Sequence, residues 1–231
     1  MIQKVKKIFD HIMLNPTYVS TKKIEQVLKK SKLLNCNKIL DVGCGDKKYH
    51  KLFSSSSYIG LEYPSNTEDH PVDIKLPDIW GDARKLPFKD NYFEALICFQ
   101  VLEHIPETSE IIQEFNRVLM LDGKLIISVP HSYRIHESPY DFWRFTKYGL
   151  IYLLLKNGFE IIQIEPTTNS FYNAWNILLT TLFQPNVKCT KLKIAILTLT
   201  MYFLKLTVYN MDDQKEWENP VDWIVIAKKS K

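Results

Sequence analysis

The sequence predicts an α/β fold with a doubly wound, mostly parallel central sheet. Short apolar runs typical of buried strands alternate with stretches whose apolar residues recur at helical spacing. The first apolar run leads directly into two glycines, a turn typical of the ligand-binding edge of such sheets. The 231 residues are sufficient for one domain of this kind with an added segment.

Each element follows from the same two periods. Strands are expected at 38–42, 58–62, 94–100, 124–129, 159–164 and 223–227. Helices are expected at 2–13, 21–34, from Gly45 through 53, at 106–120 and from Thr146 to 157. Asp122-Gly123 predicts a turn before the fourth strand, Thr146 predicts an N-terminal cap, and Gly158 predicts a C-terminal cap.

The composition excludes several classes of protein. The hydrophobic fraction of 45% and the charged fraction of 24% are typical of folded globular proteins. The four cysteines contain no CxxC pair, which argues against a zinc ribbon, a thioredoxin-like site and a secreted disulfide framework. Lysines interrupt the first apolar residues, so no secretory leader is expected and the predicted location is cytoplasmic.

The N-terminal segment is basic. Residues 1–38 contain nine lysines and two acids, a net charge of +7, so the rest of the chain carries −3. This segment is either a solvated helix face or a surface for phosphates, and anionic lipid is one source of those. We therefore divide the chain into residues 1–37, a helical lid or membrane-surface segment, and a catalytic domain at 38–231.

An apolar insertion precedes the last strand, at about 170–210. Residues 175–183 and 192–209 are apolar nearly all round, but Lys193 and Lys205 argue against a membrane-spanning helix. A helical subdomain, a homodimer face and a peripheral contact with the inner membrane face stay open.

The glycine turn and an acid downstream predict a nucleoside-type ligand. Gly43 and Gly45 follow the first strand, and Glu62 ends the second, where a carboxylate can bind both ribose hydroxyls. A dinucleotide fingerprint has a third glycine at position 48, which here is Lys48, so an NAD-dependent reductase is disfavoured.

At this point the sequence resembles the class I S-adenosylmethionine (SAM)-dependent methyltransferases. The resemblance runs from about residue 38 to 165 through four segments in order: 40–45, Glu62, 81–88 and 93–105. It implies a Rossmann-like sheet of seven strands and SAM as cofactor. No metal is expected, because the His and Asp residues of the loop that follows 124–129 could hold one but show no ligand spacing. The cofactor-binding residues that it implies are Asp41, Gly43, Cys44, Gly45, Glu62, Tyr63, Asp82, Ala83, Gln100, Val101 and His104.

The sequence departs from many members of the family at Lys47, where they have a further glycine. With this departure, the segment 45–53 is similar to a bacterial subgroup found with glycan and lipid-linked saccharide genes. The segment 136–146 and the apolar insertion also resemble that subgroup. The resemblance implies O-methylation of a saccharide or lipid-linked saccharide. Methylation of another small molecule, such as a quinone precursor, and a non-catalytic partner-binding protein are the alternatives; nucleic acid is not expected.

Oxygen methylation needs a base to remove the acceptor's proton. The candidates for this base are His131, which follows the predicted strand 124–129 after Pro130, and His136, five residues further on. Asp141 of the same loop is a third candidate for catalysis. Arg144 and Trp143 are candidates for binding the acceptor. The alternatives are that Arg144 pairs with Asp141 to hold the loop and that Trp143 anchors it.

Overall fold

The computed structural model describes residues 18–31, 36–53, 57–64, 77–182, 195–196, 199–200 and 218–230. The helix expected at 2–13 lies outside these residues. So does most of the second apolar stretch, 192–209, of which only 195–196 and 199–200 are described, as helical.

A seven-stranded sheet forms the centre of the molecule, as the resemblance predicted. Its strands are β1 (Lys38–Val42), β2 (Ser57–Glu62), β3 (Ile79–Trp80), β4 (Phe93–Phe99), β5 (Leu119–Pro130), β6 (Phe159–Pro166) and β7 (Asp222–Lys229). The order is β3-β2-β1-β4-β5-β7-β6, with β7 antiparallel to both neighbours and the other pairs parallel. The two-residue β3 is too short to show a period and was not among the six predicted strands.

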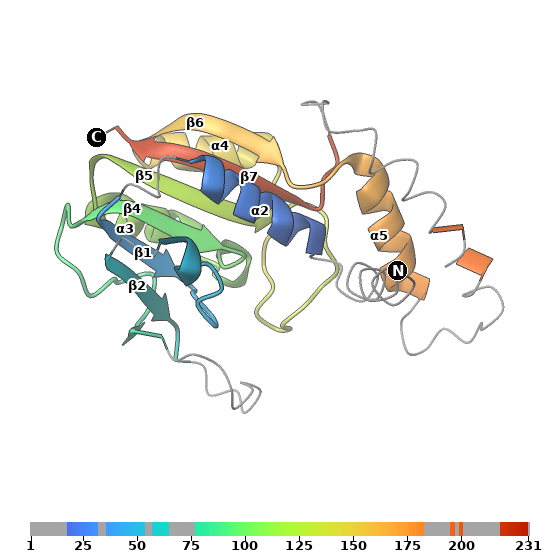
Figure 1. Cartoon of the computed structure of the whole chain (residues 1–231), viewed down its shortest axis with the longest axis horizontal. Coiled ribbons are helices and arrows are strands. Elements are labelled where there is room, and N and C mark those ends of the chain that lie inside the picture. The colour runs from blue at the N-terminus through green and yellow to red at the C-terminus, as the bar shows by residue number, and fades with distance from the viewer. Residues whose placement is uncertain are drawn as a thin grey trace.

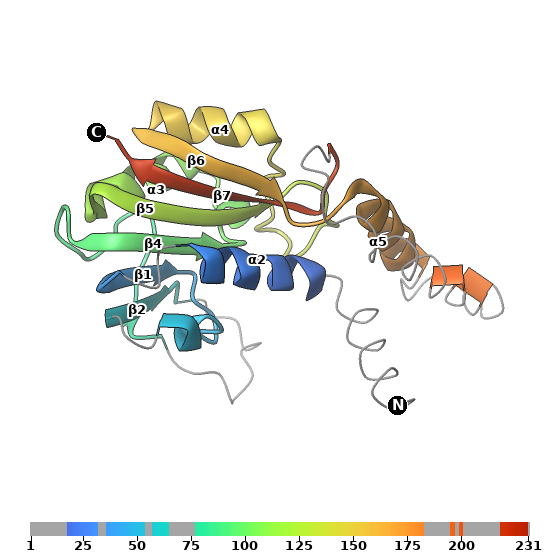
Figure 2. The same ribbon diagram turned by 45° about the horizontal axis from the view of Figure 1, so that its top comes forward.

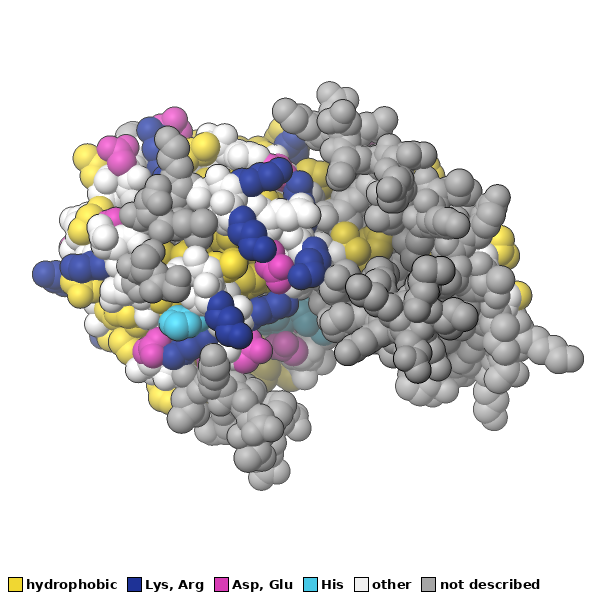
Figure 3. Space-filling model, in the orientation of Figure 1, with side chains coloured by type: hydrophobic (Ala, Val, Ile, Leu, Met, Phe, Trp, Pro, Cys, Tyr) yellow, Lys and Arg dark blue, Asp and Glu magenta, His cyan; other side chains and the backbone are white. Residues whose placement is uncertain are grey.

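Helices cover both faces of the sheet (Figures 1 and 2). Helix α2 (Tyr18–Lys30) lies across one face, and α3 (Thr108–Val118) and α4 (Lys147–Lys156) lie on the other. Ile24, Val27 and Leu28 of α2 are buried against the sheet, and each contributes about 1.5–3 kcal/mol by leaving water. The lysines of α2 lie on its outer side, where Figure 3 shows Lys and Arg side chains gathered.

The caps predicted for α4 are confirmed. The backbone N–H of Gly149 donates to Oγ1 of Thr146 at 3.1 Å, so the hydroxyl satisfies a free donor of the first turn. Gly158 follows the helix with φ of +80°, the left-handed conformation that glycine adopts without strain.

The helix expected from Gly45 through Phe53 was wrong. Turns follow Gly45, and only the 3₁₀ helix η2 (His50–Phe53) forms. Lys47 has a φ of +55°, outside the right-handed helical region, so a helix cannot run through it. Helix α2 also ends earlier than expected, at Lys30, where Ser31 Oγ donates to Leu28 O at 2.7 Å.

The turn at Asp122-Gly123 does not begin a new strand. Both residues lie inside β5, where the pairing with β4 shifts register between Phe93 and Ala95. Asp122 has a φ of +60°, and a Cβ on Gly123 would lie 2.7 Å from the carbonyl oxygen of Met120. The turn signal therefore marks an irregularity within one strand. Helix α3 is likewise shorter than the expected 106–120.

Helix α5 (Ser170–Leu182) extends from the sheet into the apolar insertion (Figure 1). Its Ile177 and Leu178 are exposed. Among the described residues, none of the helices has the length and apolar character needed to cross a membrane.

Candidate functional site

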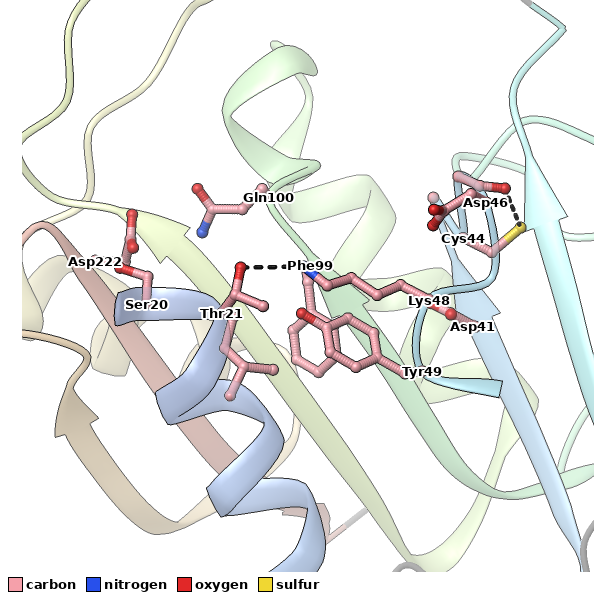
Figure 4. Close-up of a pocket in the computed structure, with 13 residues that line it drawn as sticks. Ser20, Thr21, Asp41, Cys44, Asp46, Lys48, Tyr49, Phe99, Gln100 and Asp222 are labelled. Atoms are coloured by element: carbon pink, nitrogen blue, oxygen red, sulfur yellow. Dashed lines mark hydrogen bonds between the residues drawn. The ribbon is translucent and has the colours of Figure 1, made fainter. Parts of the chain in front are cut away.

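A pocket of about 240 Å³ lies at the carboxyl edge of the sheet. Strands β1 and β4 end there because they are parallel, and β7 begins there because it is antiparallel. Figure 4 shows side chains from these three strands, the glycine turn and α2 around one space. The lining residues are Ser20, Thr21, Ile24, Asp41, Gly43, Cys44, Gly45, Asp46, Lys48, Tyr49, Phe99, Gln100 and Asp222.

The glycine turn leaves the backbone open to a ligand. Gly43 has a φ of +71°, and a Cβ there would lie 2.2 Å from Cγ2 of Val101. Gly45 has a φ of +50° and faces open space, with no atom within 4 Å of a Cβ built on it. Gly43 therefore permits close packing on the segment after β4, and Gly45 permits close approach of a ligand.

Glu62 is tied to this turn. Its Oε2 accepts a hydrogen bond from the Gly45 N–H at 2.7 Å, and its Oε1 accepts one from the Tyr63 N–H at 3.1 Å. A carboxylate has about four acceptor positions, so lone pairs remain for two hydroxyl groups. Tyr63 is exposed beside it.

Asp82 and Ala83 continue the same edge beyond β3. The Gly81 N–H donates to Glu62 O at 2.9 Å, which places this segment next to the end of β2. Hydrogen bonds from Arg84 hold the pKa of Asp82 below its usual value, so Asp82 is ionised, and Ala83 is buried. Glu62, Tyr63, Asp82 and Ala83 do not line the pocket described above; Glu62 is joined to it through its hydrogen bond with Gly45.

Asp41 is buried beneath the turn. Its carboxylate accepts a hydrogen bond from the Tyr58 hydroxyl, and burial raises its pKa to about 7 despite that bond. Asp41 and Cys44 both line the pocket, as does Gln100 from the end of β4.

Several lining residues were not among the predicted site residues. Lys48 Nζ donates to Thr21 Oγ1 at 3.2 Å, which joins the glycine turn to the first turn of α2 (Figure 4). Asp222, with Ser20 beside it, lies on the opposite side; it is 4% exposed, and burial raises its pKa to about 6. The sequence shows Asp222 as a carboxylate at the start of an otherwise apolar strand. It lies at the pocket because β7 runs antiparallel to β5, which the sequence did not indicate.

The three candidate histidines divide into two groups. His131 follows β5 beside β7: its N–H donates to Val221 O at 2.8 Å, and its ring packs edge-on against Trp223. Its Nδ1 lies 3.0 Å from Phe145 O and so donates there, which leaves Nε2 with the lone pair. His104 and His136 instead pack against each other, with ring centroids 4.9 Å apart.

The loop that carries His131 and His136 is held by the predicted ion pair between Asp141 and Arg144. Arg144 contacts both carboxylate oxygens of Asp141, at 2.6 and 2.7 Å, and Asp141 is almost fully buried. The remaining N–H groups of Arg144 donate to the carbonyl oxygens of Tyr133, Arg134 and Trp143. All five N–H groups are used within the loop, which supports an anchoring role rather than one in binding an acceptor.

Trp143 and its neighbours connect the loop to the segment after β4. The indole Nε1 of Trp143 donates to Ile105 O at 3.2 Å, although 45% of the residue is exposed. Tyr140 and Phe142 are also exposed, and the N–H of Phe142 donates to Glu103 O. This fits the anchoring alternative and leaves aromatic surface free.

Glu103 was not among the predicted site residues. It is fully buried, both of its carboxylate oxygens lack a hydrogen-bond partner, and burial raises its pKa to about 8. The signal in the sequence was the pair Glu103-His104 after the strand β4. From the sequence, only His104 of this pair was assigned, to cofactor binding.

Comparison with known proteins identifies the core. Residues 40–127 match the methyltransferase domain family. An uncharacterised protein of Methanocaldococcus jannaschii is 32% identical over 136 residues, 58% of each chain. The probable S-adenosylmethionine-dependent methyltransferase of Mycolicibacterium smegmatis is 27% identical over 147 residues, which are 59% of this chain and 56% of that protein. The chain thus spans less than two thirds of these relatives.

Other relatives and solved structures agree on the fold. Demethylmenaquinone methyltransferase of Staphylococcus saprophyticus is 25% identical over 60% of this chain and 66% of that protein. A SAM-dependent methyltransferase structure from Archaeoglobus fulgidus superposes with a TM-score of 0.57 at 16% identity, covering 97% of this chain and 99% of that one. The [4+2]-cyclase SpnF superposes with a TM-score of 0.56 at 18% identity, covering 89% and 80%. Residues 40–127 of this chain thus match a methyltransferase domain, and the described chain has the Rossmann-like fold seen in SAM-dependent methyltransferase structures.

Proposed function

We propose that the protein transfers a methyl group from SAM to a hydroxyl group of a small-molecule acceptor, a saccharide or lipid-linked saccharide. The observation that carries this proposal is the pocket itself. One space joins the glycine turn, typical of the cofactor end, to the polar side chains of Ser20, Thr21 and Asp222. Polar groups at that end suit a hydroxyl-bearing acceptor better than an apolar one.

The residues present fit SAM. The open face of Gly45 can admit the cofactor's amino-acid part, and Glu62 has lone pairs for the ribose hydroxyls. We assign Asp82 and Ala83 to the adenine, because the Gly81 N–H that precedes them bonds Glu62 O. When bound, SAM supplies an electrophilic methyl group. The chain's part is to position cofactor and acceptor and to remove the acceptor's proton.

His131 is the base that we propose for this proton. Its Nε2 carries the lone pair because Nδ1 donates to Phe145 O, and its backbone lies beside β7, whose first residue lines the pocket. His136 lies in the other histidine group, next to Asp141, and Arg144 and Trp143 have anchoring contacts. Of the predicted acceptor-side residues, His131 is thus the one that we place in catalysis.

A quinone precursor is the second candidate acceptor. Demethylmenaquinone methyltransferases of two Staphylococcus species are among the relatives, at 25% and 28% identity. The neighbour SpnF is described as a cyclase, which shows that the fold alone does not fix the reaction.

Three further predictions concern the whole chain. They are a domain boundary after residue 37, a cytoplasmic location, and a contact of the apolar insertion with a membrane surface or a second copy of the chain. The contacts of α2 support a role in closing the pocket. Thr21 at its start bonds Lys48 of the glycine turn, and its apolar side packs on the sheet. A loosened α2 would therefore open the pocket.

Cofactor binding is tested by calorimetric titration with S-adenosylhomocysteine, with NADH as the control ligand. We expect S-adenosylhomocysteine to bind and the Glu62→Ala variant to bind it at least ~10-fold more weakly, because two hydroxyl contacts are lost. Binding of NADH alone would refute the proposal. No binding of either ligand by folded protein would favour a non-catalytic role.

Methyl transfer is tested by following S-adenosylhomocysteine formation with panels of saccharide and of quinone-precursor acceptors. We expect turnover on the saccharide panel, and a His131→Ala variant to lower kcat by ~10²–10⁴-fold without changing S-adenosylhomocysteine affinity. Turnover only on the quinone panel would replace the acceptor. Undiminished turnover by His131→Ala would remove this histidine as the base.

A further inference from the structure

We infer that Glu103, His104 and His136 form a binding site for one divalent transition-metal ion, of the Zn²⁺ or Fe²⁺ class. One ligand atom from each of the three residues lies within 4.8 Å of the other two. Two imidazoles with one carboxylate are a ligand set that proteins use for these ions while leaving coordination positions open.

The first argument is the state of Glu103. Its side chain is completely buried, and neither carboxylate oxygen has a hydrogen-bond partner. A buried carboxyl group without partners is costly in either its charged or its neutral form. Arg144 cannot supply the partner, because all five of its N–H groups are donated elsewhere. A bound cation would satisfy both oxygens.

The second argument is the orientation of the two imidazoles. His104 Nδ1 lies 2.8 Å from Tyr140 O, and a carbonyl can only accept, so Nδ1 carries the hydrogen and Nε2 the lone pair. That Nε2 lies 3.9 Å from Oε1 of Glu103. His136 Nδ1 lies 3.3 Å from both Arg134 O and Asp141 Oδ2, so its Nε2 is also the free nitrogen. Oxygen acceptors on the far ring nitrogen are typical of metal-binding histidines.

The geometry requires a small contraction. Ligand atoms about 2.0–2.2 Å from an ion lie roughly 3.0–3.5 Å from one another, so each donor moves inward by about 1 Å. His136 is on the loop 131–146 and its side chain is partly exposed. Glu137, whose exposed carboxylate lies 3.7 Å from His104 Nε2, can add a fourth ligand. Among the described residues, the carboxylates of Asp141 and Asp222 also act on Glu103 and outnumber the one cation that does so, the Arg144 guanidinium, which is itself paired with Asp141.

The ion's role rests on the proposed function. The ligand set leaves coordination positions free, and a hydroxyl oxygen of the acceptor is a suitable ligand for one of them. The segment 100–104 connects the two places, since Gln100 lines the pocket and Glu103 and His104 follow it. The ion would thus hold and orient the acceptor.

The test is binding of Zn²⁺ to protein first stripped with a chelator, measured by calorimetry, with the visible spectrum of a Co²⁺-loaded sample as a second readout. We expect one Zn²⁺ per chain. The His136→Ala and Glu103→Gln variants should each lose more than ~100-fold in Zn²⁺ affinity, which exceeds the roughly 10–100-fold typical of losing an outer-shell partner. His50→Ala, which removes an exposed imidazole outside the cluster, is the matched control and should bind like wild type.

Equal Zn²⁺ affinity of wild type, His136→Ala and Glu103→Gln would overturn the site, as would a folded wild type that binds neither metal. Should Glu103→Gln fail to fold, His136→Ala decides, because His136 is only partly buried. Failure of the proposed function is separate. If the protein binds Zn²⁺ but transfers no methyl group, the metal site is supported and the proposed function is refuted. If the protein binds no metal and still transfers the methyl group after treatment with the chelator, only the metal site is refuted.

Discussion

The proposed site has two halves, one that we assign to the cofactor and one that we assign to the acceptor, and they are built in different ways. The cofactor half is mainly backbone: two glycines with positive φ, main-chain N–H groups and the strand ends that they follow. The acceptor half combines Ser20, Thr21 and Asp222 of the pocket with the loop 131–146, which is held by the pair of Asp141 and Arg144. A backbone site is specified within a few residues, whereas a loop site depends on contacts made after folding.

The largest expected effect is on the cofactor half. In Gly43→Ala, the new Cβ would lie 2.2 Å from Val101 in a left-handed backbone, so we expect a loss of roughly 2–5 kcal/mol of unfolding free energy and of S-adenosylhomocysteine binding. Gly45→Ala meets no protein atom and should cost only about 1–2 kcal/mol, yet still block binding.

Urea denaturation and calorimetric titration of both variants measure this difference. Adding Val101→Ala to Gly43→Ala should recover part of the stability by removing the clash, leaving the backbone strain. Equal stability losses in the two glycine variants would contradict the distinction between a packing glycine and a ligand-facing one.

A smaller effect is expected from breaking the acceptor half. Asp141→Asn leaves the Arg144 guanidinium facing an uncharged amide in a nearly buried position, so we expect a loss of about 2–4 kcal/mol. The loop should become susceptible to chymotrypsin at Tyr140, Phe142 and Trp143, while S-adenosylhomocysteine affinity stays unchanged.

The matched control is Asp90→Asn. Asp90 also pairs with an arginine, Arg117 at 2.7 Å, but it is exposed, so its loss should cost less than about 1 kcal/mol. If Asp141→Asn is no more destabilising than this control, or weakens cofactor binding, the two halves are not independent.

The smallest effect concerns pH. Burial raises the pKa of Asp41 to about 7, so the folded state holds a proton that the unfolded state releases at about pH 4. The stability this contributes is full below pH 4 and is lost as pH rises to 7. Asp41→Asn keeps an acceptor for the Tyr58 hydroxyl and cannot ionise, so we expect it to exceed wild type by on the order of 1–3 kcal/mol at pH 8.

Urea midpoints at pH 4, 6 and 8 check this prediction, with Asp46→Asn, an exposed acid of the same turn, as the control. The advantage of Asp41→Asn should vanish at pH 4. An advantage that is constant across these pH values would show that Asp41 does not carry the effect.

The sequence by itself determined most of the sheet and the glycine turn of the proposed cofactor half. Strand runs, the caps of α4 and the turn at Gly43 and Gly45 are local signals, because their period, conformation and hydrogen bonds involve near neighbours in the chain. The helix expected after Gly45 does not form, because Lys47 takes a left-handed conformation. No local sequence pattern indicated that conformation.

Only the tertiary structure decided the acceptor half. Asp222 reaches the pocket because β7 runs antiparallel, and Ser20 and Thr21 reach it because α2 packs across the sheet. His131 and His136, five residues apart, separate into different surroundings because the loop folds back on the segment after β4. Such contacts join residues far apart in the chain, and the sequence carries no period or spacing that records them.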